Sequence, residues 1–208
     1  MTLLAFKDIR RKIPAKAPAA LILALLIGFL LIFLSPEDKE LGAVLKLIYL
    51  HGALVTSGLS LFTAAGLVSM ILLFRSRMNF KLLFAIEKTA VIFWVAATII
   101  GDLTSVLAWG GINPGEPRFV ATIIISLVSV SVYYISTSID NHKIISLLGI
   151  GLALSVWALM GSAGNILHPD NPFGASEPSI KTFFFLISLV FLVASVLTVR
   201  WIKKMQKQ

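Results

Sequence analysis

Two histidines in this sequence stand at the ends of apolar stretches and could bind a metal. His51 lies in LKLIYLHGAL and His168 in GNILHPDNPF. Neutral imidazole is a common ligand of transition metals and of haem iron. Because the two histidines are expected at the same level of a membrane, the pair favours a bis-imidazole site for a planar metallocycle such as haem b.

Small residues accompany both histidines. Gly161, Gly164 and His168 are spaced by three and four residues, which would place them on one stripe of a helix. His51 and Gly58 are seven residues apart and would also share a helical face. Such glycines would leave space for a ligand beside each imidazole, but in membrane helices they more often mark close helix–helix contacts. Both interpretations stay open at this point.

The composition shows what kind of protein must position these groups. Of the 208 residues, 58% are hydrophobic and 13% are charged, and the mean hydropathy is +0.94. Such values indicate an integral membrane protein. Windows of about 20 residues predict an all-α fold in which a single domain, 1–208, forms six transmembrane helices, the first of them retained and not cleaved. The predicted helices are residues 17–34, 47–74, 83–108, 119–139, 144–167 and 181–200.

Charge predicts the orientation of these helices. Basic residues precede the first helix, flank the second and fourth connections, and follow the last helix. By the positive-inside rule, both termini are cytoplasmic, and the loops with the two histidines face outward. We expect a multi-pass protein of a plasma membrane, from a prokaryote. The net charge of +8 is then explained by topology and anionic lipids, so no nucleic-acid partner is expected.

A third polar segment, WGGINPGEPRF (109–119), connects two of the predicted helices, and with it the sequence resembles a known family. CcmC-type haem-handling proteins of cytochrome c maturation carry a signature close to W-G-x-W-W-x-W-D-x-R in this place, flanked by two haem-ligating histidines. Trp109 and Gly110 match its first two positions, Arg118 matches its arginine, and Glu116 replaces its aspartate. YLHGAL and NILHP resemble the family's histidine segments. The resemblance covers about residue 40 to the C-terminus.

The resemblance implies non-covalent binding of haem b at the outer face, with His51 and His168 as axial ligands, and delivery of that haem to an acceptor. Arg118 is the best placed cation for a propionate, because guanidinium pairs with carboxylate in a bidentate way. Trp109 could stack on the ring edge. The chain is then a haem carrier and not an enzyme. Its expected partners are lipids, haem, other membrane subunits, and an outer-face haem acceptor or redox protein.

The loop departs from the family signature, which leaves two alternatives. Ile112, Asn113 and Gly115 stand where the family has the tryptophans that cradle the macrocycle and meet its acceptor. One alternative is a haem b electron-transfer subunit of a membrane redox complex, whose haem stays in place. The other is a haem-free assembly or transporter subunit. Since the chain has no cysteine, covalent haem attachment and thiolate sites are excluded.

The remaining polar residues carry less information. Glu87 and Lys88 are expected at the cytoplasmic start of the third helix, where Glu87 suits the helix dipole and Lys88 extends toward the headgroups. Asp102 is expected near the outer interface, and His142 in a solvated turn without a second histidine. We find no chain of buried carboxylates of the kind that proton pumps contain.

Overall fold

The computed structural model describes residues 18–75, 79–164 and 176–206 of the chain. Every predicted helix is present, and every observed helix end lies within five residues of its expected position. The all-α architecture is therefore confirmed for the described residues. The helices are α1 (Ala19–Leu34), α2 (Val44–Phe74), α3 (Lys81–Trp109), α4 (Pro117–Ser138), α5 (His142–Ser162) and α6 (Pro178–Met205).

The helices from α2 to α6 are long and apolar enough to cross a membrane. The first helix is apolar but shorter, with 16 residues in the described part of the chain. At 1.5 Å per residue it extends roughly 24 Å, which is less than the hydrocarbon thickness of about 30 Å. Five of the six expected spans are therefore confirmed by length and composition, and α1 is too short in its described part. The chain is a multi-pass membrane protein.

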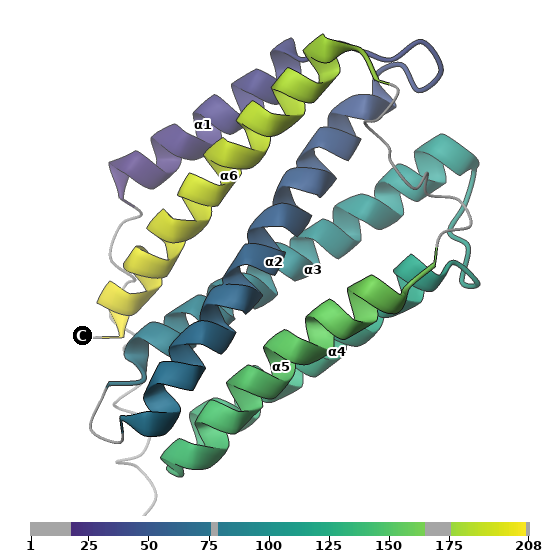
Figure 1. Ribbon diagram of the computed structural model, residues 1–208. Coiled ribbons are helices and arrows are strands. Elements are labelled where there is room, and N and C mark those ends of the chain that lie inside the picture. The colour runs from purple at the N-terminus through teal and green to yellow at the C-terminus, as the bar shows by residue number, and fades with distance from the viewer. Residues whose placement is uncertain (1–17, 76–78, 165–175, 207–208) are drawn as a thin grey trace, which may run out of the picture.

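The helices pack side by side as three pairs (Figure 1). α1 lies along α6, α2 along α3, and α4 along α5. The second helix is central, since it also contacts α5 and α6. The connections from α1 to α2 and from α3 to α4 lie at one end of the bundle, where α5 also ends and α6 begins (Figure 1); this end is here named the loop end. The other end is named the opposite end.

Two glycines of α2 let neighbouring helices approach closely. A Cβ atom added to Gly58 would lie 3.0 Å from the Trp94 ring of α3, and one added to Gly66 would lie 2.5 Å from the Cβ atom of Ala153 of α5. The indole therefore occupies the space beside Gly58 that was expected to receive a ligand. Of the two interpretations of Gly58, the helix–helix contact is the one that the packing supports.

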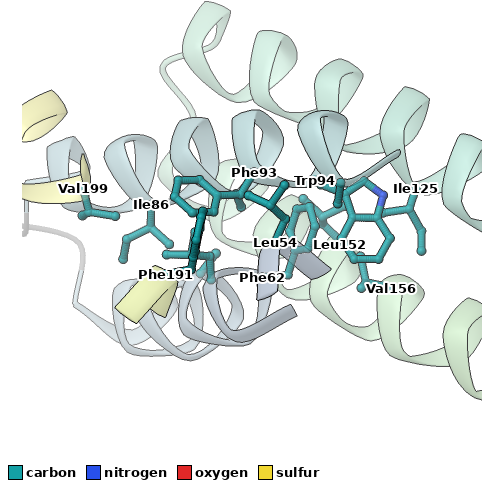
Figure 2. Packing of buried hydrophobic residues seen from close by; sticks show 14 of the residues in the cluster. Leu54, Phe62, Ile86, Phe93, Trp94, Ile125, Leu152, Val156, Phe191 and Val199 are labelled. Carbon is teal, nitrogen blue, oxygen red and sulfur yellow. The ribbon is translucent and has the colours of Figure 1, made fainter. Parts of the chain in front are cut away.

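The middle of the bundle packs around Trp94 (Figure 2). This side chain is fully buried and meets Phe62 of α2 edge to face, with 5.7 Å between the ring centroids. Its Nε1–H donates a 3.2 Å hydrogen bond to the Thr122 carbonyl of α4. A buried indole needs such a polar partner. One side chain thus joins α2, α3 and α4.

A methyl group at Gly66 should loosen the contact between α2 and α5. The Ala153 methyl cannot rotate away, so Gly66→Ala forces the helices apart and should lower the free energy of unfolding by about 1–3 kcal/mol. Thermal unfolding in detergent micelles would measure this loss. Gly161→Ala is the matched control, because its Cβ atom would meet nothing within 4 Å. Equal stability of the two variants would contradict the packing argument.

Candidate functional site

A cavity of about 500 Å³ opens at the loop end between α2, α3, α4 and α6. Three residues that the sequence predicted for one site, His51, Trp109 and Arg118, line it together. The volume falls within the usual range of small-molecule sites, roughly 300–1,000 Å³. Ile48, Phe119 and Phe184 add apolar surface to the wall. The cavity therefore suits a ligand that is largely apolar and carries a few polar groups.

The orientation of His51 is set by α3. Its Nδ1 atom lies 2.9 Å from the carbonyl oxygen of Ala97. Because a carbonyl can only accept a hydrogen bond, Nδ1 must carry the proton, and in the neutral ring Nε2 then holds the lone pair. Metal-ligating histidines commonly have their other nitrogen bound in this way. The contact with Ala97 thus fixes the orientation and the tautomer of the His51 ring.

Gly101 of α3 provides the space for this imidazole. A Cβ atom added at this position would lie 2.7 Å from Cε1 and 2.9 Å from Nδ1 of His51. Gly101 was not among the residues predicted for the site, although it precedes Asp102 near the end of an apolar run. The importance of a glycine at this position follows from the packing of α2 against α3, which the sequence does not show.

The loop from Gly110 to Glu116 is a compact turn, in which the N–H of Glu116 donates a 3.0 Å hydrogen bond to the Asn113 carbonyl. Gly110 ends α3 in the left-handed conformation, with φ of 77°, a region that glycine enters without strain. The Asn113 side chain accepts a 2.9 Å hydrogen bond from the N–H of Gly115. Pro117 is the first residue of α4, where no N–H is needed. The loop thereby holds Trp109 at one edge of the cavity and Arg118 at another.

Trp109 and Arg118 present different surfaces to the cavity. The Trp109 side chain is 42% exposed, so part of its ring is open to contact. The Nε atom of Arg118 is buried and has no hydrogen-bond partner among the described residues. Glu116 is only 2% exposed and makes no salt bridge with Arg118. Arg118 therefore keeps a buried donor that an anionic ligand could satisfy.

Carboxyl groups outnumber cations around the cavity. Asp38, Glu40, Asp102 and Glu116 line it, and Arg118 is the one Lys or Arg among its described lining residues. A 2.8 Å hydrogen bond from the backbone N–H of Glu40 holds the pKa of Asp38 below its usual value, so this carboxyl group is ionised at neutral pH. The negative groups of a ligand would be attracted to Arg118. A positive charge on the ligand would be stabilised near the carboxyl groups that line the rest of the cavity.

The predicted stripe on the fifth helix is wrong. α5 ends at Ser162, and the next residue is already extended, so Gly164 cannot share a helical face with Gly161. The apolar pattern of the sequence continues through this end, but Gly164 and Asn165 are poor helix formers. Gly161 is exposed, with nothing within 4 Å of an added Cβ atom, so it makes no close helix contact. His168 lies outside the described residues.

No family model matches this chain, and no curated protein does either. The resemblance to haem-handling proteins therefore rests on the motifs around His51, Trp109 and His168. Function has to be argued from the cavity and its side chains, since a fold alone does not specify an activity.

Two residues at the opposite end differ in how well they were predicted. His142 is exposed at the start of α5, as expected, and its ring stacks on Phe80 with 5.1 Å between the centroids. Glu87 was expected at the start of a helix but lies well inside α3 and is 0% exposed. That expectation was wrong, because the helix begins at Lys81, more than one turn earlier.

A methyl group at Gly101 should displace the His51 ring. Gly101→Ala places a Cβ atom too close to the imidazole and should break the hydrogen bond from Nδ1 to Ala97. Nitrogen NMR of labelled histidine would detect this as a loss of the Nδ1–H tautomer. Gly111→Ala in the loop is the control, since it meets nothing within 4 Å. An unchanged His51 signal in Gly101→Ala would refute the proposed role of Gly101.

Proposed function

We propose that this protein binds haem b non-covalently in the cavity at the loop end, with His51 as an axial ligand of the iron. The observation that carries the proposal is that His51, Trp109 and Arg118 line one cavity of about 500 Å³, in which a hydrogen bond from Nδ1 to the Ala97 carbonyl fixes the orientation of the His51 ring. Bound haem supplies a redox-active iron, and the protein supplies binding and orientation. In this proposal the protein is not an enzyme.

The charges of the cavity fit such a ligand. A propionate at Arg118 would give the buried Nε atom the acceptor it lacks among the described residues. The surrounding carboxyl groups, Asp102 and Glu116 among them, suit the net positive charge of a ferric porphyrin core. Trp109 offers an aromatic face at the rim. The roles of Arg118 and Trp109 are the ones expected from the sequence, whereas the role of the carboxyl groups is inferred from the cavity alone.

We propose His168 as the second axial ligand. It lies outside the described residues, but the cavity is lined by Met160 before this segment and by Ser176 after it. Described residues on both sides of the segment that contains His168 therefore line the cavity. This supports His168 over His142, which lies at the opposite end beside Phe80.

Haem handling, in which haem is passed to an outer-face acceptor, is the function that the motifs favour. An electron-transfer subunit that retains its haem is the second candidate, and the loop favours it. Besides lacking the family's inner tryptophans, the loop is held by a 2.8 Å hydrogen bond from Ser105 to the Gly111 carbonyl. A handler should lose its haem to apomyoglobin within the time of purification. An electron-transfer subunit should retain haem and titrate reversibly.

The distribution of charge supports an outward-facing loop end and cytoplasmic termini. Among the described residues, several basic side chains lie at or near the helix ends of the opposite end, whereas most acidic side chains lie at the loop end. The positive-inside rule then places the cavity outside a plasma membrane. These basic residues are Arg75, Lys81, Lys143, Lys203 and Lys204.

Haem binding should depend on His51. The purified protein should show the absorption spectrum of low-spin, bis-histidine haem, and His51→Ala should abolish it and weaken haem binding by more than about tenfold, or 1.4 kcal/mol. His142→Ala is the matched control and should leave the spectrum unchanged. Wild-type protein that is purified without haem and cannot be reconstituted with it would overturn the proposed function.

The orientation can be tested with single cysteines, because the natural chain has none. Gly111→Cys at the loop end should react with a membrane-impermeant maleimide in intact cells. Asp140→Cys at the opposite end should react only after the membrane is permeabilised. The reverse pattern would place the cavity on the cytoplasmic side.

A further inference from the structure

A carboxyl group lies inside the bundle, far from the cavity. Glu87 of α3 is 0% exposed, and neither of its oxygens has a hydrogen-bond partner among the described residues. The hydroxyl groups of Ser69 in α2 and Ser146 in α5 are equally buried and equally without partners there. In a membrane-spanning segment such groups are costly to bury, and an ionisable one among them indicates a functional site.

A glycine of α5 lets two of these groups meet. A Cβ atom added to Gly149 would lie 3.3 Å from Oε1 of Glu87 and would clash with Oγ of Ser69. The carboxyl group of α3 and the hydroxyl group of α2 therefore share the space that a side chain at this position would fill. Ser146 lies one turn earlier on the same face of α5. Three helices thus contribute to one polar cluster.

The surroundings of Glu87 decide which ligand it can hold. It forms no salt bridge with any described residue. Tyr133 of α4 is a titratable side chain among the described residues that interacts with it electrostatically, while Arg200 and Lys203 of α6 are at least partly exposed. An ionised carboxylate would therefore stay buried without a counter-charge. A protonated acid can instead donate its O–H to a serine hydroxyl.

A second pocket, of about 220 Å³, lies at the opposite end of the bundle. Phe84 of α3, Ser136 of α4 and Ile145 of α5 line it. One helical turn deeper, α3 presents Glu87 and α4 presents Tyr133. The Ser136 hydroxyl is buried without a partner in the described part of the chain, so polar groups continue from the pocket inward.

We propose that Glu87 is a proton-binding site inside the membrane, with Ser69 and Ser146 as its hydroxyl partners, and that its proton exchanges with water through the pocket lined by Asp140 and His142. This assignment does not depend on haem binding. It gives the protein a group that can gain or lose a proton from the side of the membrane opposite to the cavity.

The test uses the full-length protein in lipid vesicles and dicyclohexylcarbodiimide, an apolar reagent that attaches to protonated carboxyl groups within membranes. Mass spectrometry should find the adduct on Glu87 at neutral pH, and labelling should fall to background as the pH is raised. Glu87→Gln keeps the size of the side chain and should abolish the adduct, whereas Glu40→Gln at the loop end should not. Protection by sodium ions would overturn the assignment in favour of a cation site.

Infrared difference spectroscopy provides a second measurement that a merely structural role would not affect. The wild-type protein should show a protonated-carboxyl band that shifts in heavy water and is missing in Glu87→Gln. Ser69→Ala should move this band to higher frequency, because it removes a hydroxyl group that lies beside the acid, and Ser105→Ala should leave it in place. A missing carboxyl band, or one that never exchanges its proton, would overturn the proposal.

Discussion

Close approach of helices to the glycines of α2 is the constraint on which the rest of this structure depends. In lipid, helices gain little from the hydrophobic effect when they associate, so contact between their surfaces must hold them together. Gly52, Gly58 and Gly66 of α2 receive side chains of α6, α3 and α5 respectively. One helix thus sets the distance to three neighbours, and α1 and α4 pack against the elements that it has placed.

The interface between α2 and α3 positions polar groups at both of its ends. At the loop end it presses His51 against Gly101 and fixes the imidazole through Ala97. At the opposite end it brings Ser69 beside Glu87. Between them lies a packed apolar middle, centred on one buried tryptophan (Figure 2). A change in the distance between α2 and α3 would therefore alter the geometry around both His51 and Glu87.

The number of helices and most of their bounds could be predicted because the hydrocarbon layer imposes a length and a composition on each span. The face that each helix turns toward the other helices could not be predicted. Lipid-facing and buried positions are both apolar, so the hydrophobicity of the sequence does not alternate between the two faces. Gly58 and Glu87 show the consequence. For Gly58 the sequence left a ligand space and a helix–helix contact open, and the structure places an indole there; Glu87 was expected at a helix end and is fully buried.

The sequence by itself was enough to predict an integral membrane protein, the number of its helices and their approximate bounds. It also singled out His51, Trp109 and Arg118 as residues of one site. Only the tertiary structure decided that these three share one cavity, that the fifth helix ends before Gly164, and that an acid lies among serines inside the bundle. Hydropathy and spacing report how one segment meets lipid and water. Which side chains meet each other depends on how closely neighbouring helices can approach, and that is a property of pairs of surfaces that no single segment contains.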